Sequence, residues 1–424
     1  MSTDTRARIK SLHRRAVDHL HQGIIPFWLE RALDREFGGF FTNFDEAGRP
    51  YDMPEKYLNT QCRLVWWFSH LTRKFPDVAG YRALADAGAS FVRDRFWDAE
   101  HGGFFWKIRR DGNRLDDGKV SYGQSFAIYA LSEHALATGD AASLDLASRT
   151  FNLLQRFAAD TLNGGYYENM EPDWSPATAG FHGGDRKGLD THMHLMEAFT
   201  VLYQASGDWL HRRKLIEVTD LIVQRMICPQ TGCGLNQFDL AWQSVPAIAV
   251  RRTWNAERLG EQPADPTETT SYGHNVELAW LMSRALNVAG VSLEKYKPVL
   301  KRLLDHAVTH GIDTQFGGVY RDGLREGGAL VLEKEFWQHA ECLVGFLDGY
   351  EIFGDPRYLE AFESVWNFVD RFLIIKGVGE WRTLCDRQGN VVDGKIGNPW
   401  KVSYHTGRAL IESAERLDRL DRSL

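Results

Sequence analysis

Residues 271–280, SYGHNVELAW, join a short polar turn directly to an apolar segment with helical periodicity. This pattern places His274 in the first turn of a helix, near the positive end of the helix dipole, which keeps the ring neutral near pH 7. Glu277 follows three residues later on the same side of the helix, where it can orient or charge-balance that ring. A lone histidine of this kind is more often a structural residue. A functional role for this stretch is favoured because the same arrangement of a polar turn and a helix start recurs along the chain.

A Gly-rich aromatic motif occurs six times, each time between two segments with helical periodicity. A second set of motifs marks the other joints: TGD at 138–140, SGD at 206–208 and FGD at 353–355. In these joints Gly can close one helix in the left-handed conformation and Asp can cap the next. The six aromatic motifs are GGFF at 38–41, GGFFW at 102–106, GGYYE at 164–168, GCGLN at 232–236, GGVYRDG at 317–323 and GEW at 379–381.

The periodicity predicts twelve helices, in which odd-numbered helices lead into long loops with the aromatic motif and even-numbered helices lead into short joints. Six such hairpins cannot bury their apolar faces alone and are best closed as a ring, with the even helices inside. We therefore predict an all-α (α/α)6 barrel, with short β-hairpins in the long loops at one mouth, as a single catalytic domain over residues 1–424. A linear solenoid of helix pairs is the competing arrangement. The predicted helices span 5–33, 57–74, 80–96, 122–138, 141–158, 189–205, 209–227, 273–288, 294–309, 335–353, 355–372 and 402–420.

Composition narrows the classes of partner. The 424 residues are 43% hydrophobic, and a net charge of -7 with both signs interspersed gives no basic footprint for nucleic acid or a membrane surface. The N-terminal residues 1–15 contain no apolar signal-peptide core, and no apolar run is long enough to span a bilayer, so we expect a cytoplasmic protein. The five cysteines lie at no metal spacing and are expected to be reduced thiols.

The even-numbered helices begin with polar and aromatic residues where a buried helix is expected to be apolar. In a closed barrel these six starts converge on one cavity, and this convergence is the functional signal. Arg63 lies between Tyr57 and an apolar run, which favours a buried, paired arginine over a surface one. Trp337 and Trp400 can be core residues, but at a wet rim they would stack on sugar faces. The starts carry Arg63; Tyr122 and Gln124; His192, His194 and Glu197; His274 and Glu277; Trp337, His339 and Glu341; Trp400, Tyr404, His405 and Arg408.

No metal or cofactor is predicted. His192 and His194 are two residues apart on a helix, so they point about 200° apart and cannot bind one ion together. One of the pair is expected to face the cavity and the other to pack outward. Zinc-binding patterns of the HExxH type are absent, and no GxGxxG or phosphate loop opens a helix.

Several segments resemble the N-acylglucosamine 2-epimerase superfamily, and within it the branch of cellobiose 2-epimerases and mannose 2-epimerases. The resemblance covers nearly the whole chain in the right order. It is carried by KYLNTQCRLVWWFSHL (56–71), YGQSFAIYALSEHALATGD (122–140), THMHLMEAFTVLY (191–203), SYGHNVELAWLM (271–282), AECLVGFLDGY (340–350) and WKVSYHTGRALIE (400–412).

The resemblance implies an (α/α)6 barrel that acts on aldoses without a metal or redox cofactor. It places the family's catalytic positions at Arg63, His194, His274 and His405, and its substrate-lining positions at Glu277, Glu341, Trp337 and Trp400. We expect Tyr122, Gln124 and Arg408, from the same helix starts, to bind the sugar as well. The sequence departs from the family pattern at Phe336, His339 and Asn275, which are expected near the second sugar or the far end of a monosaccharide.

These residues favour a 2-epimerase that interconverts C2 epimers of glucose or mannose, or of a 4-linked disaccharide such as cellobiose. His274 and His405 are the natural pair for removing and returning the C2 proton through a cis-enediolate. Arg63 would stabilise the oxyanion, and His194 would assist ring opening or bind O1 or O2. An aldose–ketose isomerase would use the same residues. Less favoured are a glycoside hydrolase using Glu197, Glu277 or Glu341, and a sugar-binding protein. The choice among a monosaccharide, a disaccharide and an N-acetylated hexosamine stays open, as does the choice between monomer and homodimer.

Overall fold

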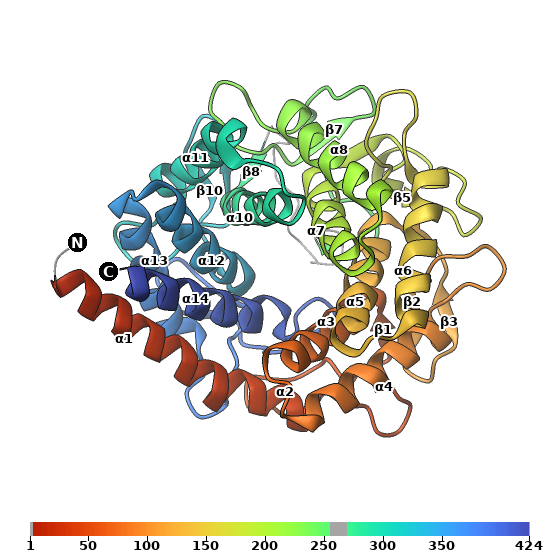
Figure 1. Cartoon of the computed structure of the whole chain (residues 1–424), viewed down its shortest axis with the longest axis horizontal. Coiled ribbons are helices and arrows are strands. Elements are labelled where there is room, and N and C mark those ends of the chain that lie inside the picture. Colours follow the sequence, from red (N-terminus) through yellow and green to blue (C-terminus); the bar gives the residue numbers. More distant parts are fainter. Residues whose placement is uncertain (1–2, 255–268, 424) are drawn as a thin grey trace.

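Six helices form an inner ring and the others surround it, as Figure 1 shows in a view down the ring. The computed structural model describes residues 3–254 and 269–423. Each inner helix packs against the next along the chain, and the last packs against the first, so the ring is closed. The predicted (α/α)6 barrel is therefore confirmed, and an open solenoid is excluded. The inner helices are α3 (Leu58–Lys74), α5 (Ser121–Thr138), α7 (Leu189–Ser206), α10 (Tyr272–Val288), α12 (Phe336–Phe353) and α14 (Ser403–Ser423).

The outer ring begins with one long segment, in which α1 (Thr3–His19) and α2 (Ile25–Arg31) are joined by a π turn, Leu20–Ile24. Three further outer helices end in π turns of the same length, so each continues for about one turn beyond its α-helical part. The predicted helical segments are all present, with ends shifted by a few residues. The other outer helices are α4 (Ala79–Arg95), α6 (Ala141–Leu153), α8 (Trp209–Arg225), α11 (Lys297–His306) and α13 (Pro356–Phe368), and the three π turns are Leu154–Ala158, Ala307–Gly311 and Val369–Leu373.

The short joints follow the predicted Gly–Asp chemistry. Gly139 closes α5 with φ 77°, and the carboxylate of Asp140 accepts a hydrogen bond from the N–H of Ala142 at 3.1 Å. Gly207 and Asp208 repeat this arrangement between α7 and α8, as Gly354 and Asp355 do between α12 and α13. Each joint therefore satisfies backbone groups at two helix ends at once.

Short strands join neighbouring hairpins at the opposite mouth. A strand that leads into one inner helix pairs antiparallel with a strand of the next long loop, as β1 (Glu55–Tyr57) does with β2 (Lys107–Arg109). The N–H of Phe44 donates to the carbonyl of Gly397 at 3.0 Å, which links the first loop to the last. The predicted β-hairpins are present within three of the long loops, where the second strand of each adds a third strand to the pair that joins neighbouring loops. The remaining pairings are β2 with β3 (Arg114–Asp116), β4 (Lys119–Val120) with β5 (Asn169–Met170), β6 (Arg186–Gly188) with β7 (Gln237–Asp239), β8 (Thr269–Ser271) with β9 (Asp322–Leu324) and then β10 (Ala329–Val331), and β11 (Lys334–Glu335) with β12 (Leu384–Cys385) and then β13 (Val391–Asp393).

A buried lysine lies two residues before five of the inner helices and pairs with an acid beside the preceding aromatic motif. Removing either partner of such a pair would leave an uncompensated buried charge. In the hairpin of α10, Thr270 takes the position of the lysine and Cys228 takes the position of the acid. The five pairs are Lys56–Asp34, Lys119–Asp98, Lys187–Asp160, Lys334–Asp313 and Lys401–Glu380, with N–O distances of 2.8, 2.6, 2.7, 3.2 and 3.3 Å.

The inner helices are buried on every side over most of their length. In α3, for example, residues 58–72 are all buried, which explains why this helix lacks a solvent-facing polar stripe. Polar side chains at the mouth ends of the inner helices are therefore enclosed by protein and need partners. Among the helices described, none combines the length and the apolar character needed to cross a bilayer.

Candidate active site

The fourth residue of each inner helix anchors the loop that precedes it. In five helices this side chain accepts a hydrogen bond from a backbone N–H in the aromatic motif. The donor is the third residue of the motif, as Phe104 is for Gln124 at 2.9 Å. The sixth helix uses Thr406, which donates to Glu380, while Glu380 accepts the N–H of Trp381. The other four bonds are Phe40 N–H to Gln61 at 2.8 Å, Tyr166 N–H to His192 at 3.0 Å, Gly234 N–H to Asn275 at 2.8 Å and Val319 N–H to His339 at 3.2 Å.

These anchors leave no room for a side chain at the second motif glycine. Gly165 and Gly318 adopt φ values of 77° and 73°. A Cβ atom would lie 2.8 Å from Nε2 of His192 at Gly165, and 2.5 Å from Nε2 of His339 at Gly318. Glycine is therefore required both by the left-handed backbone and by the close approach of the anchor.

The anchors correct three expectations. Gln124 was expected to bind the sugar, but it is fully buried, and its Nε2–H also donates to the carbonyl of Phe104 at 2.8 Å. Asn275 and His339, expected near the far end of the sugar, are likewise fully buried and hold backbone groups. The expectation that one histidine of the pair on α7 would face outward is correct, since His192 is the anchor there.

Gln124→Leu is expected to destabilise the fold without changing substrate affinity. The N–H and C=O of Phe104 would both lose their buried partner, at a cost of about 2–4 kcal/mol for the two groups. Ser125→Ala, at the next position, removes only a hydrogen bond to the carbonyl of Tyr122 and should cost about 1 kcal/mol or less. Chemical unfolding measures the stability, and KM measures the affinity. A raised KM with unchanged stability would restore the substrate-binding role.

The sixth residue of each inner helix forms a layer across the ring. Its centre is Arg408 of α14, whose guanidinium is fully buried. Its Nη2 donates to Glu277 at 3.0 Å and to Glu341 at 2.7 Å, and its Nη1 donates to Glu197 and to the hydroxyl of Tyr404. The layer consists of Arg63, Phe126, His194, Glu277, Glu341 and Arg408.

Arg408 was expected to bind the sugar, but in this structure both of its Nη atoms bond acids of the barrel interior. Glu341 is also committed, because its second oxygen accepts from Trp280 Nε1 at 3.0 Å. Glu277 was expected to orient His274, but its bonded oxygen goes to Arg408. Burial, together with the neighbouring charge of Glu341, raises the pKa of Glu277 well above its usual value, which favours its protonated form.

His405 is held in a base-competent form. Its Nδ1 lies 2.6 Å from Glu341 Oε1, and that carboxylate accepts from Arg408 and Trp280 as well. Burial, reinforced by the charges of Arg63, Arg408 and His194, lowers the His405 pKa well below 6.5. The ring is therefore neutral at pH 7, with Nδ1–H directed to Glu341 and a lone pair on Nε2.

His194 and His274 share a carboxylate that sequence reasoning missed, Asp190. One oxygen of Asp190 lies 3.2 Å from Nε2 of His194 and 3.6 Å from Nε2 of His274. The other nitrogen of His194 bonds Glu197 at 2.8 Å. The pairing of Asp190 with His194 at i and i+4 was the signal available in the sequence.

Arg63, Tyr122, Trp400 and Trp337 complete the site. Arg63 donates to the Tyr122 hydroxyl and to the Trp400 carbonyl, both at 2.8 Å. The Trp400 ring packs 6.2 Å from that of Tyr122. Trp337 lies against both candidate bases, with ring centroids 4.6 Å from His274 and 5.9 Å from His405. The two histidines therefore flank the same tryptophan, although they come from different helices.

Glu277, Glu341 and His405 have ligand atoms within 4.8 Å of one another, as the ligands of a metal ion would. The Nη2 of Arg408 already donates to one oxygen of each carboxylate. The positive charge of the Arg408 guanidinium thus occupies the position that a metal ion would need. The two carboxylates and His405 therefore fit Arg408 better than a metal ion.

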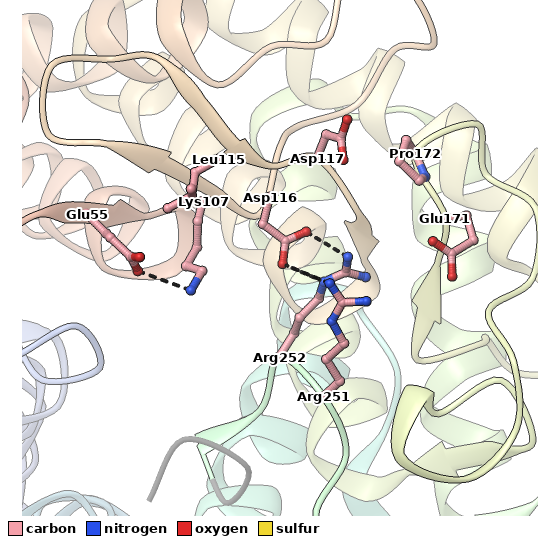
Figure 2. A pocket seen from close by; sticks show the side chains of 9 residues that line it. All are labelled: Glu55, Lys107, Leu115, Asp116, Asp117, Glu171, Pro172, Arg251 and Arg252. Atoms are coloured by element: carbon pink, nitrogen blue, oxygen red, sulfur yellow. Dashed lines mark hydrogen bonds and ion pairs between the residues drawn. The ribbon is translucent and has the colours of Figure 1, made fainter.

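A pocket of about 380 Å³ lies at the mouth beside the site and is shown in Figure 2. Its charged lining is largely paired internally: Glu55 binds Lys107 at 3.1 Å, and Arg252 makes two bonds to Asp116. Lys107 also lies 3.3 Å from the Tyr57 hydroxyl, and Tyr57 packs on Trp400. The pocket borders the site through Tyr57 but contains none of the proposed catalytic residues.

Comparison with known proteins places this geometry in a family. The chain matches the N-acylglucosamine 2-epimerase (GlcNAc 2-epimerase) family over residues 39–409. The cellobiose 2-epimerase of Bacteroides fragilis is 30% identical over 92% of this chain and 95% of that protein. The structure of cellobiose 2-epimerase from Spirochaeta thermophila superposes with a TM-score of 0.86 at 27% identity, covering 99% of this chain and 100% of that one. The structure of a D-mannose isomerase, 22% identical, shares the fold with a TM-score of 0.81, covering 98% and 99% of the two chains.

Fold, site and relatives together define a carbohydrate epimerase, an enzyme of the isomerase class. The chain belongs to the N-acylglucosamine 2-epimerase family, as its sequence motifs predicted.

Proposed function

We propose that this enzyme inverts C2 of glucose or mannose, or of the reducing sugar of a 4-linked disaccharide such as cellobiose, with His274 and His405 as the two proton-transfer groups. The observation that carries the proposal is that both rings lie against Trp337, so a sugar beside this tryptophan would meet a base from each of two helices. The proposal includes a cytoplasmic, metal-independent enzyme that acts as a monomer or homodimer. The contacts of Arg408 with the buried acids support a metal-independent site, and the five free cysteines support a reducing compartment.

The reaction begins from the open-chain aldehyde, whose carbonyl makes the C2 proton acidic. One histidine in its neutral form takes that proton, and a cis-enediolate forms. The other histidine, in its protonated form, delivers a proton to the opposite face of C2. Each ring has a carboxylate that stabilises its imidazolium: Glu341 at 2.6 Å from His405, and Asp190 at 3.6 Å from His274.

Arg63 is suited to stabilise the enediolate oxygen. It is buried among aromatic rings, with Phe126 and Tyr404 at 4.5 and 4.9 Å from its guanidinium carbon, and its Nε has no hydrogen-bond partner within the described residues. A fixed positive charge in such surroundings acts most strongly on the charge that develops in the transition state. Tyr122, bonded to Arg63, can bind a neighbouring hydroxyl.

The alternatives differ in how well the site supports them. An aldose–ketose isomerase would return the proton to C1 with the same residues. A glycoside hydrolase needs two available carboxyl groups, but Glu197, Glu277 and Glu341 all bond Arg408. A sugar-binding protein would have no need for two histidines whose pKa values are lowered by their surroundings.

Proton NMR of the enzyme with mannose, glucose and cellobiose in D2O containing EDTA tests the proposal. An aldose product with inverted C2 and deuterium at that carbon is the expected result, and it identifies the sugar. A ketose product would replace the proposal with the isomerase reading. If none of these sugars, nor N-acetylglucosamine, exchanged its C2 proton, both the epimerase and the isomerase functions would be contradicted.

The acid limb of the pH profile of kcat/KM is expected to lie below pH 6.5. Burial lowers the pKa values of His405 and His274, so the required neutral base persists below 6.5. Burial alone would lower the pKa of His194, but hydrogen bonds to Asp190 and Glu197 raise it to about 10, so His194 does not set this acid limb. Initial rates measured across the range in which the protein stays folded check this profile. An acid limb at or above pH 6.5 would contradict the assigned neutral bases.

A further inference from the structure

Asp190 differs from the other carboxylates of the site in its exposure. Its side chain is 45% exposed, whereas the side chains of Glu197, Glu277 and Glu341 are at most 3% exposed. It lies in the first turn of α7, where the helix dipole favours a negative charge. Asp190 is thus the acid that a ligand entering the mouth can reach, and His194 is its nearest partner at 3.2 Å.

At rest this pair is an aspartate beside an imidazolium. Desolvation by the surrounding protein opposes charge on both groups, but their mutual hydrogen bond and the second bond from His194 to Glu197 outweigh it. The pKa of Asp190 is lowered to about 2, and that of His194 is raised to about 10. Glu197 is in turn held by Tyr404 at 2.8 Å and by Arg408, so the His194 ring is fixed from below. An acid and a base in the right protonation states therefore lie side by side.

We propose that Asp190 and His194 form the acid–base pair that opens the sugar ring before the C2 chemistry. This inference rests on the proposed function, because a cyclic aldose has no carbonyl group to acidify its C2 proton. It assigns Asp190 a direct catalytic role that the motif analysis did not identify.

In the proposed step Asp190 accepts the proton of the anomeric hydroxyl, O1. The C1–O1 bond becomes the aldehyde carbonyl, the C1–O5 bond breaks, and Nε2–H of His194 gives its proton to O5. Because O1 and O5 are bonded to the same carbon, acid and base must lie next to each other, as the 3.2 Å spacing allows. The proton on Asp190 then returns to His194 across their own hydrogen bond, which resets the pair without another reactant.

A merely structural Asp190 would only orient His274, whose Nε2 lies 3.6 Å away. The two roles differ in a measurable way, because ring opening interconverts the α and β anomers and needs no chemistry at C2. Loss of orientation at His274 would slow epimerisation but leave anomer exchange intact.

The test is exchange NMR of anomer interconversion in glucose, mannose and cellobiose, with C2 deuterium incorporation followed in the same samples. The wild-type enzyme is expected to accelerate anomer exchange, and Asp190→Asn to reduce that acceleration by about 100-fold. Asp185→Asn is the matched control: its side chain is 43% exposed in the loop before α7, and both rates should be unchanged. Formate added to Asp190→Gly is expected to restore at least part of the acceleration, which a purely structural role would not allow.

Two outcomes would overturn the assignment: Asp190→Asn accelerates anomer exchange as the wild type does, or the wild type incorporates C2 deuterium without accelerating anomer exchange. Failure of the proposed function gives a different result, namely accelerated anomer exchange in the wild type with no deuterium at C2 of any sugar. Circular dichroism and thermal unfolding of each variant show whether a loss reflects misfolding.

Discussion

His405→Asn is expected to lower kcat by at least about 10³-fold and to leave the fold intact. The neutral ring of His405 supplies one of the two proton transfers, and a positioned acid or base contributes about 10²–10⁴-fold to a rate. Asparagine keeps a donor toward Glu341 but has no group that can take a proton from carbon. Steady-state epimerisation and C2 exchange in D2O both measure the loss.

The matched control is His192→Asn, two residues before His194 on α7. His192 is as buried as His405 but accepts the backbone N–H of Tyr166. Asparagine already performs this task at Asn275 in another hairpin. The control should keep kcat within a few fold of the wild type, even if some stability is lost. Residual activity of His405→Asn within tenfold of the wild type would rule out its role as a base.

Arg408→Met is expected to remove about 3–5 kcal/mol from the free energy of unfolding. Its guanidinium binds three buried acids, Glu197, Glu277 and Glu341, and breaking a buried ion pair leaves uncompensated charge in a medium that solvates it poorly. Denaturant unfolding at pH 7 measures the loss. Adding Glu197→Gln to the Arg408→Met variant should recover part of the stability, because one of the unpaired charges is removed.

Arg419→Met on the same helix provides the comparison. Arg419 pairs with Glu351 at 2.8 Å, but its side chain is 53% exposed, so its loss should cost less than about 1 kcal/mol. If Arg408→Met were as stable as Arg419→Met and only raised KM, Arg408 would be a substrate-binding residue after all.

The sequence predicted the ring of hairpins because its markers are local. Left-handed glycines, aspartate caps and helical periodicity each depend on a few neighbouring residues. Because the helical hairpin occurs six times, a closed ring is the arrangement that buries all the apolar faces. The polar helix starts also showed which mouth carries the site. The sequence pattern did not predict how far below the mouth each side chain lies. His405 and Arg408 are three residues apart on one helix, yet Arg408 bonds the acids beneath the site.

The direction of each side chain was predictable where the helical angle was applied. Two residues apart on a helix means opposite faces, and this reasoning correctly separated His192 from His194. The same rule applied to Tyr122 and Gln124 would have shown that only one of the two can face the cavity, and the structure shows Gln124 to be the anchor. Asp190 was missed for another reason: its importance depends on His274 of a different helix, and such a contact has no signal within α7.

The loop anchors have an evolutionary consequence. Each inner helix fixes its own preceding loop through its fourth residue, so the rest of that loop can change in length or sequence without displacing the helix start. Mutations in these loops need not alter the spacing of Asp190, His194, His274 and His405, which depends on the inner helices. A barrel built in this way can change its substrate range while it keeps the residues that transfer protons.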